Sequence, residues 1–324
     1  MGVNASVLAV DAGNSKTDVA LIGEDGSVLS TSRGGGFQPP AVGVETAVDV
    51  LASAIGEAFA SCEADPGGVI HVSACLANAD LPVEEAELTE ALLRRGWGRT
   101  VEVRNDTFAI LRAGVDEPRG VAVVCGAGIN CVGMVPDGRT ARFPAIGRIS
   151  GDWGGGSGLA EEALWFAARA EDGRGEPTEL VRTLPGHFGL GTMYELIEAL
   201  HRGLIPDGRR HELTPVLFAT SAAGDPVAGA LVDRLADEVV AMASVALGTL
   251  GLLTEDVPVV LGGSVLAARH PRLDDRIAGL LSERAPKAVV RVVAQPPVLG
   301  AALLGLDHTE AAPEAHRRLR SHYT

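Results

Sequence analysis

One order of secondary-structure elements occurs twice in this chain of 324 residues, and this repeat limits the possible folds more than any other feature. In each half, an apolar run rich in β-branched residues leads into a turn of small residues, and two more strand-like runs follow. The last two runs of each set are separated by a hairpin signal, Asp25-Gly26 in the first half and Asp137-Gly138 in the second. Each half therefore begins with a predicted meander of three strands.

Helices and strands alternate after each meander. The first half is predicted to contain strands at residues 7–10, 17–22 and 28–32, a helix at 44–60, a strand at 69–75, a helix at 83–94, a strand at 101–104 and a helix from Asp106. The second half is predicted to contain strands at 121–124, 131–135 and 139–143, helical segments over 159–250, a strand at 258–261, a helix at 274–283, a strand at 288–293 and a helix from Pro297. Both halves read β-β-β-α-β-α-β-α, with a helical insertion in the second. This order predicts an α/β protein of two pseudo-symmetric domains with helices on both faces of each sheet.

The repeat also gives the expected domain boundaries. We expect an N-terminal lobe at residues 1–117, a C-terminal lobe at 118–297 that includes the helical insertion, and a C-terminal helix and tail at 298–324. Packing of that tail on the N-terminal lobe is one option. Ligands commonly bind between domains at the ends of strands, so we expect an interdomain cleft lined by the Gly-rich turns.

Composition excludes several classes of protein. The chain has 27 Lys+Arg against 42 Asp+Glu, a formal net charge of −15, which argues against a nucleic-acid partner. Hydrophobic residues make up 46% and charged residues 21%, so the chain is not disordered. The longest apolar stretch, residues 239–253, is shorter than the ~20 residues of a membrane span, so we expect no membrane partner.

Cysteines and histidines give no sign of a metal site. The four cysteines, at positions 62, 75, 125 and 131, form no CxxC pair and no zinc-finger spacing. Four cysteines in so long a chain do not make a disulfide scaffold, which favours a reducing, cytoplasmic compartment. The eight histidines show no i,i+4 pair, and we expect them on the surface without a metal cluster.

The turn after the first strand has the composition of a phosphate-binding loop. It reads Asp11-Ala12-Gly13-Asn14-Ser15-Lys16-Thr17 and contains one of only two lysines in the chain. Small residues let backbone N–H groups approach phosphate oxygens, Ser15 and Thr17 add donors, and Asp11 at the strand end is suited to a hydrated magnesium ion. Taken alone, an ordinary Gly/Asn hairpin explains this loop equally well.

A second loop stands at the equivalent place in the other half. It reads Gly126-Ala127-Gly128-Ile129-Asn130 and offers a further set of backbone amides. Two such loops at equivalent places in a repeat predict a clamp on a polyphosphate. The chain has no G-x-x-x-x-G-K-[ST] motif, no clean G-x-G-x-x-G before a helix and no G-x-S-x-G, which excludes a P-loop and argues against a Rossmann site or a hydrolase elbow.

Three further segments could carry chemistry. Asp106 follows a strand and starts a helix, so it is an N-cap, a base for a substrate hydroxyl, or both. Residues 150–158, Ser-Gly-Asp-Trp-Gly-Gly-Gly-Ser-Gly, place Asp152 to bind substrate hydroxyls or form a flexible linker. Residues 262–264, Gly-Gly-Ser, admit a nucleoside or form a helix-entry turn.

Together these motifs resemble those of N-acetylglucosamine kinase-like proteins of the BadF/BadG/BcrA/BcrD ATPase family, which have the actin/hexokinase-type fold. The resemblance runs from Val7 to about Leu306. The family's D-G-G-G-T-K-T is matched by residues 11–17, its N-D pair by 105–106, its G-T-G-S-N by 126–130, its G-D-E-G-S by 151–155, its G-G by 262–263 and its P-x-x-G-A by 297–301.

The resemblance implies an ATP- and Mg²⁺-dependent sugar kinase that phosphorylates a hydroxyl, the 6-hydroxyl of N-acetylglucosamine being the leading expectation. It makes Asp106 the catalytic base and Asp11 the magnesium residue, acting through water. The implied nucleotide contacts are Asp11, Gly13, Asn14, Ser15, Lys16, Thr17, Gly126, Ala127, Gly128, Gly262, Gly263 and Ser264. The implied sugar contacts are Gln38, Asn105, Asp106, Asn130, Asp152 and Trp153.

The sequence departs from the family pattern at several of these places. Ala127 and Ile129 stand where the family has hydroxyl residues, Gln38 stands for an Asn, and Trp153 replaces an acid and offers a stacking platform for a sugar. Two other functions stay open: a nucleotide- or sugar-sensing protein without turnover, and an ATPase that activates a dehydratase through an iron–sulfur cluster shared by a dimer. A homodimer is likewise left open for the kinase.

Overall fold

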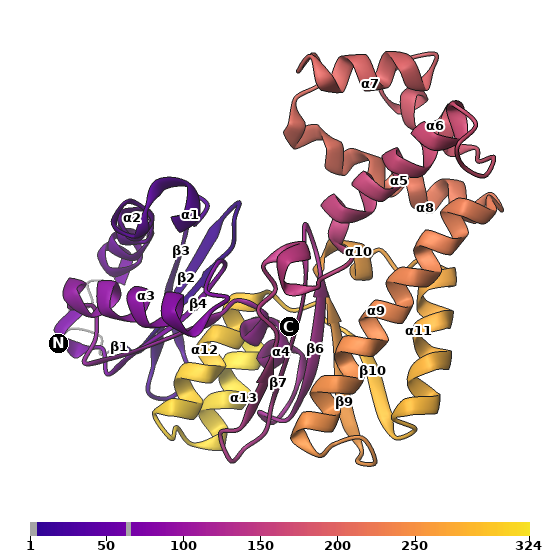
Figure 1. Cartoon of the computed structure of the whole chain (residues 1–324). Coiled ribbons are helices and arrows are strands. Elements are labelled where there is room, and N and C mark those ends of the chain that lie inside the picture. The colour runs from indigo at the N-terminus through magenta and orange to yellow at the C-terminus, as the bar shows by residue number, and fades with distance from the viewer. Residues whose placement is uncertain (1–4, 63–65) are drawn as a thin grey trace. The chain divides into compact units, whose positions relative to one another are not determined.

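Each predicted meander forms three neighbouring strands of a five-stranded sheet (Figure 1). The structure is a computed structural model that describes residues 5–62 and 66–324. The chain divides into two compact units. Unit 1 comprises Met1–Ala122, Val132–Pro144 and Arg291–Thr324, and unit 2 comprises Val123–Cys131 and Ala145–Val290.

The first sheet has the strand order β3-β2-β1-β4-β5. Its strands are β1 (Ala5–Ala12), β2 (Thr17–Gly23), β3 (Val28–Gly34), β4 (His71–Leu76) and β5 (Thr100–Asn105). Strands β1, β2 and β3 are antiparallel, whereas β1, β4 and β5 run parallel. The register aligns Ala12 with Leu76 and Leu76 with Asn105, so the carboxyl ends of the parallel strands meet at one edge.

Helices cover both faces of this sheet. One face packs against α2 (Val44–Cys62) and α3 (Pro82–Arg95), and the other against α12 (Pro297–His308), which also packs on α4 (Thr107–Gly114). Every residue from Val298 to Leu306 is buried, as expected for a helix that is apolar on all sides. Unit 1 also contains α1 (Pro39–Val42), the short 3-10 turn η1 (Pro66–Gly68) and α13 (Pro313–His322).

A buried ion pair fixes the end of α12 to α4. Arg112 is 2% exposed, and its Nε and Nη2 donate to the two carboxylate oxygens of Asp307 at 2.7 and 3.0 Å. Burial alone would raise the pKa of Asp307, but hydrogen bonds from His316 and Arg112 outweigh it and lower that pKa below its usual range. The pair therefore depends on both charges being present.

Replacing Asp307 by Ala should lower the free energy of unfolding by about 3–5 kcal/mol, because the Arg112 guanidinium would stay buried without its counter-charge. Chemical denaturation measures this change. The matched control is Glu314→Gln, which removes one partner of an exposed ion pair with Arg317 and should leave stability nearly unchanged. Equal stability of the Asp307 variant and the parent would contradict the prediction.

The second sheet has the order β10-β9-β6-β7-β8. Its strands are β6 (Gly120–Cys125), β7 (Ile129–Met134), β8 (Thr140–Arg142), β9 (Val257–Gly262) and β10 (Ala288–Val292). Its order of elements agrees with the prediction, although β7 begins at Ile129, within the predicted second loop. The short helix α10 (Gly263–Ala267) and the helix α11 (Pro271–Arg284) follow β9.

The predicted helical insertion is present. It consists of α5 (Gly155–Glu171), α6 (Leu180–His187), α7 (Met193–His201), the 3-10 segment η3 (Asp207–Glu212), α8 (Leu213–Ala222) and α9 (Pro226–Leu250), and a 3-10 turn, η2 (Gly147–Ser150), precedes it. Within residues 5–62 and 66–324, no helix combines the length and the apolar character that crossing a membrane requires.

One histidine contradicts the expectation that all eight lie on the surface. His71, the first residue of β4, is fully buried, and its ring stacks on that of His308 with 3.7 Å between the ring centroids. Burial, with the neighbouring His308, lowers the pKa of His71 to about 4. The sequence could not indicate this, since position 71 is adjacent to position 308 only in the folded chain.

Candidate active site

The two carboxylates that the sequence singled out in the first half lie at the same edge of the first sheet. Asp11 is the penultimate residue of β1, and Asp106 directly follows β5. Only β4 separates these parallel strands, so their ends are roughly 10 Å apart at about 4.8 Å per strand. The negative charge of Asp106 contributes to the raised pKa of Asp11, so the two groups interact electrostatically.

Both carboxyl groups have unusual acidity. Burial raises the pKa of Asp11 to about 8, aided by the negative charges of Asp106 and Asp18 and opposed by Lys16. Burial also raises the pKa of Asp106 to about 6, with hydrogen bonds from Thr107 as a partial offset. Such clustered, desolvated acids concentrate negative potential and are typical of functional sites.

The loop at residues 13–16 is tied down by its neighbours. The Gly13 N–H donates to the Lys16 carbonyl at 2.9 Å, which closes the turn. The Gln38 side-chain amide donates to the Asn14 carbonyl at 2.8 Å, and the Asn78 amide donates to the Asn14 Oδ1 at 2.9 Å. Asn14, Ser15 and Lys16 are exposed, so the tip of the loop is held firmly and open to a ligand.

Two residues in or near this loop differ from the sequence expectation. Thr17 is fully buried, and its hydroxyl donates to the Gly35 carbonyl at 2.8 Å, so here it fixes the loop and does not face a phosphate. Asn78 was not predicted at all. Its backbone is left-handed, at φ 62°, a conformation that Asn tolerates better than most residues, but no motif in the sequence marks position 78.

The Lys16 ammonium lies beside the acidic edge. Its Nζ is 2.7 Å from Asp18 Oδ2, while the Nε of Arg33 is 2.6 Å from the other oxygen of Asp18. Asp18 stands opposite Asp11 in the register of β1 and β2. These ion pairs hold positive charge next to the buried Asp11.

Asp106 occupies the N-cap position of α4, yet it makes no side-chain capping hydrogen bond. Asn105 takes that role, because its Oδ1 accepts from the Thr107 N–H at 2.9 Å. The Asn105 amide donates in turn to Asp80 Oδ1 at 2.8 Å. The carboxamide of Asn105 therefore helps to fix the start of the helix, and the Asp106 carboxylate makes no N-cap bond, its contacts being those with Thr107.

In unit 2, the second loop packs against the start of α5. The Gly156 and Ser157 N–H groups donate to the carbonyls of Gly126 and Ala127 at 2.7 and 3.0 Å. Gly155 has φ +74°, and a Cβ there would stand 2.5 Å from the Ala127 oxygen, so only Gly fits. The interpretation of residues 150–158 as a flexible linker is therefore wrong.

The Gly-Gly-Ser segment meets the same loop. Gly263 has φ +82°, and a Cβ on it would lie 2.4 Å from the carbonyl oxygen of Cys125. The first turn of α10 thus packs directly on the end of β6, Gly262 is buried, and Ser264 is exposed. Three segments that the sequence singled out, at residues 126–130, 150–158 and 262–264, are brought together in unit 2.

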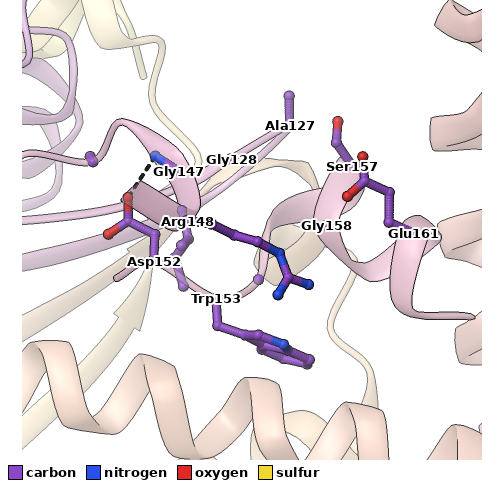
Figure 2. A pocket seen from close by; sticks show the side chains of 12 residues that line it. Ala127, Gly128, Gly147, Arg148, Asp152, Trp153, Ser157, Gly158 and Glu161 are labelled. Atoms are coloured by element: carbon purple, nitrogen blue, oxygen red, sulfur yellow. Dashed lines mark hydrogen bonds between the residues drawn. The ribbon is translucent and has the colours of Figure 1, made fainter. Parts of the chain in front are cut away.

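A cavity of about 240 Å³ lies beside the second loop. Asp152 stands on one side of it, and Ser157 and Glu161 of α5 stand on the other, with Arg148 between them (Figure 2). The Asp152 Oδ2 accepts from the Gly147 N–H at 2.9 Å and from the Ser150 hydroxyl at 2.7 Å. The complete lining is Ala127, Gly128, Ile129, Ala145, Gly147, Arg148, Asp152, Trp153, Gly154, Ser157, Gly158 and Glu161.

Two predicted sugar contacts in unit 2 have structural partners of their own. Trp153 lines the cavity but is only 7% exposed, and the Arg234 guanidinium lies 4.1 Å from the centre of its ring, so one face is already covered. Asn130 lies on β7, where its Oδ1 accepts from the Cys131 N–H at 2.7 Å, and it is not among the residues that line this cavity. Arg148, Ser157 and Glu161 were not predicted, because the family motif was matched only to residues 151–155, and these three residues lie on either side of it.

Two kinases are similar to this chain in sequence. A 25% identical N-acetylmuramic acid/N-acetylglucosamine kinase of Clostridium acetobutylicum aligns over 260 residues, which are 80% of this chain and 85% of that protein. A 23% identical N-acetyl-D-glucosamine kinase of Dictyostelium discoideum covers 93% of this chain and 97% of its own length.

Solved structures share the fold. A proposed N-acetylglucosamine kinase from Chromobacterium violaceum superposes with a TM-score of 0.69 at 20% identity, covering 93% of this chain and 99% of that one. A glucokinase of the ROK family from Streptomyces griseus, solved with glucose and AMPPNP, gives a TM-score of 0.54 at 19% identity over 92% of this chain and 98% of its own. Both likenesses place the two mixed sheets in the actin/hexokinase-type fold. The model of one family matches residues 8–305, and the chain therefore belongs to the BadF/BadG/BcrA/BcrD ATPase family.

Proposed function

We propose that this protein is an ATP-dependent sugar kinase that transfers the γ-phosphate to the 6-hydroxyl of an amino sugar, N-acetylglucosamine being the leading candidate. The observation that carries the proposal is the position of Asp106, a carboxylate at the carboxyl edge of the first sheet that makes no N-cap hydrogen bond, interacts electrostatically with Asp11 and has a pKa that burial raises to about 6. The proteins from Clostridium and Dictyostelium, both named as kinases of N-acetylglucosamine, support the choice of substrate.

Asp106 acts as the general base in this mechanism. It accepts the proton of the sugar hydroxyl as that oxygen attacks the γ-phosphorus, and the bond between the γ-phosphorus and the bridging oxygen of ADP breaks. A pKa near the working pH suits a group that must accept a proton and later release it. Positioning of the two substrates supplies most of the remaining catalysis.

The residues at this edge fit a magnesium ion. Asp11 is a buried carboxylate among the negative charges of Asp18 and Asp106, an environment that a hard, oxygen-preferring cation would relieve. Asp11 would hold the ion through water, and Mg²⁺ would neutralise charge on the phosphates when bound. The proposed nucleotide contacts are residues 13–16 in unit 1 and, in unit 2, residues 126–128 for phosphate and residues 262–264 for the nucleoside.

Asp152 is the strongest candidate for a sugar contact in unit 2. Hydrogen bonds from the Gly147 N–H and the Ser150 hydroxyl to one carboxylate oxygen hold this side chain in place. The carboxylate lines a cavity that suits one group the size of a sugar or a phosphate. A charged hydrogen bond to a sugar hydroxyl contributes about 1.5–3 kcal/mol.

We therefore expect Asp152→Ala to raise KM for the sugar roughly 10- to 100-fold, with a smaller change in KM for ATP. Steady-state kinetics measures both constants. Ser150→Ala is the matched control, because it removes one orienting bond and keeps the carboxylate, so its KM for the sugar should change much less. An unchanged KM in the Asp152 variant would remove this residue from the sugar site.

Product analysis tests the proposed function. Purified protein with ATP and Mg²⁺ is offered a panel of amino and neutral hexoses, ADP release is followed, and the position of the phosphate is determined by NMR. A 6-phosphorylated amino sugar as the best product supports the proposal. Tight sugar or nucleotide binding without ADP release would replace it with the sensing function.

The iron–sulfur alternative finds no support in the position of the cysteines. Cys125 and Cys131 are buried, and burial raises the pKa of Cys125 to about 12 and that of Cys131 further still. Cluster ligands are thiolates that a partner subunit must reach, which this environment does not provide.

A further inference from the structure

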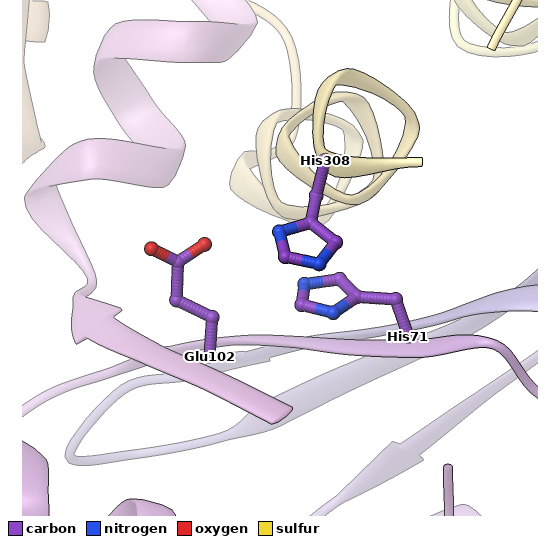
Figure 3. A group of neighbouring side chains, drawn as sticks. All are labelled: His71, Glu102 and His308. Atoms are coloured by element: carbon purple, nitrogen blue, oxygen red, sulfur yellow. The ribbon is translucent and has the colours of Figure 1, made fainter. Parts of the chain in front are cut away.

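Three potential metal ligands meet at the amino end of β4, at the opposite end of that strand from the proposed catalytic edge. His71 opens β4, Glu102 lies on β5, and His308 is the last residue of α12 (Figure 3). One ligand atom from each residue lies within 4.8 Å of the other two. Because β4 has six residues, this cluster is roughly 16 Å along the strand from the edge that carries Asp11 and Asp106.

The hydrogen bonds around His71 favour one tautomer. The Thr100 hydroxyl lies 3.1 Å from the Ile70 carbonyl, which also accepts from the Thr100 N–H, and 2.9 Å from His71 Nδ1. With the ring proton on Nδ1, the ring donates to the hydroxyl oxygen and the hydroxyl donates to the carbonyl, whereas with the proton on Nε2 only one of these two bonds can form. This assignment follows from the network of donors and acceptors. In the favoured tautomer, the Nε2 of the neutral ring is an unprotonated nitrogen with a lone pair.

That lone pair has no partner in the described part of the chain. His71 is fully buried, and Nε2 is a buried atom without a hydrogen bond. A buried polar atom left without a partner is costly and uncommon. A histidine whose one nitrogen donates to a fixed oxygen while the other is aimed into a cluster of donors has the arrangement of a metal ligand and its supporting contact.

The other two side chains can complete the site. His308 is exposed at the end of its helix, and its ring lies 12° from parallel to that of His71. Lone pairs of two ligating rings must converge on one ion, so the His308 ring has to turn, which its exposure permits. Glu102 is half-exposed, and Arg104 engages its Oε1 at 2.7 Å, which leaves its second oxygen for an ion.

We propose that His71, Glu102 and His308 form a binding site for a divalent transition-metal ion of the zinc type. Two imidazoles and one carboxylate suit zinc better than magnesium or calcium, and three protein ligands leave the fourth tetrahedral position to water. The nearby positive charge of Arg104 weakens binding. The ion would join the last turn of α12 to β4 and β5, segments more than 200 positions apart in the sequence, so its role is to stabilise unit 1.

The test uses the full chain after treatment with EDTA. Zinc is titrated in competition with a chromophoric chelator, cobalt(II) is added separately to record its visible absorption, and thermal unfolding is followed with and without zinc. We expect one zinc per chain, a cobalt spectrum of tetrahedral intensity, and a Tm that zinc raises by several degrees. All three signals should be lost in His308→Ala and retained in His201→Ala, which removes an exposed histidine outside the cluster.

Two further variants test the individual parts. Glu102→Gln should weaken zinc binding about tenfold or more, and Thr100→Val should weaken it about 10- to 100-fold, because it removes the oxygen that holds the His71 proton on Nδ1. These variants avoid substituting the buried His71 itself. Absence of a bound ion in the parent chain, or equal binding by the parent and His308→Ala, would overturn the proposal. Neither result bears on the kinase proposal, since the two sites share no residue.

Discussion

Replacing Asp106 by Asn should lower kcat for sugar phosphorylation by about 10²–10⁴-fold, the contribution typical of a positioned general base. The amide has the shape of the carboxylate but cannot accept the proton of the attacking hydroxyl. Fold and nucleotide affinity should be preserved, because Asn105, and not Asp106, caps α4 through Thr107. Steady-state kinetics on a verified sugar, with nucleotide binding measured separately, checks both statements.

Asp116→Asn is the matched control for this experiment. It makes the same chemical change in unit 1 at an exposed carboxylate that lies 3.8 Å from Arg291 and away from the acidic edge, and it should leave kcat at the parental value. A near-parental kcat for Asp106→Asn would show that Asp106 is not the base, and Asp152 would be the next candidate.

The fold was predictable because short sequence patterns indicate each helix and strand, and therefore their order along the chain. Apolar runs, Asp-Gly turns and helix periodicity lie within a few residues of one another, so they define both meanders and the alternation that follows. The apolar run after Pro297 likewise predicts a helix that is buried on all sides, and α12 is such a helix.

Features that depend on distant segments could not be predicted in this way. From the sequence alone, Gly155 and Gly263 are interpreted as linker or turn residues. Their packing against the backbone of the second loop is visible only in the folded structure. The buried state of His71 depends on α12 covering β4, and the use of the Thr17 hydroxyl depends on the carbonyl of Gly35 on the neighbouring segment. A single sequence does not show which residues far apart in the chain come into contact.

Replacing Asp11 by Asn should make the metal-free protein more stable while making it inactive. The folded protein raises the pKa of this carboxyl group from 3.8 to about 8, so the folded state binds the proton more tightly than the unfolded chain does. Between about pH 4 and pH 8 the unfolded chain gives up this proton before the folded one, and the stability of the parent falls as pH rises. Asn does not titrate and escapes this loss.

The expected gain for Asp11→Asn at pH 7 in EDTA is on the order of a few kcal/mol, and it should vanish below about pH 3, where Asp11 is protonated in both the folded and the unfolded state. Denaturation curves at the two pH values measure it. Asp49→Asn, at an exposed residue paired with Arg95, is the control and should show no such pH-dependent difference. A gain that is equal at both pH values would point to a change in packing and not in charge.

The same substitution should remove the response to nucleotide. At 100 times its dissociation constant a ligand stabilises the native state by about 2.7 kcal/mol, and in the parent this gain from MgATP should offset the cost of the buried carboxylate. In Asp11→Asn the gain should shrink sharply and sugar phosphorylation should fall with it, because the variant has lost the charge that attracts the cation. This result would explain why the protein has a buried acid that destabilises it without ligand: the acid is needed to bind the metal–nucleotide complex. Parental turnover together with an undiminished MgATP shift in the variant would reject the assignment of the first loop.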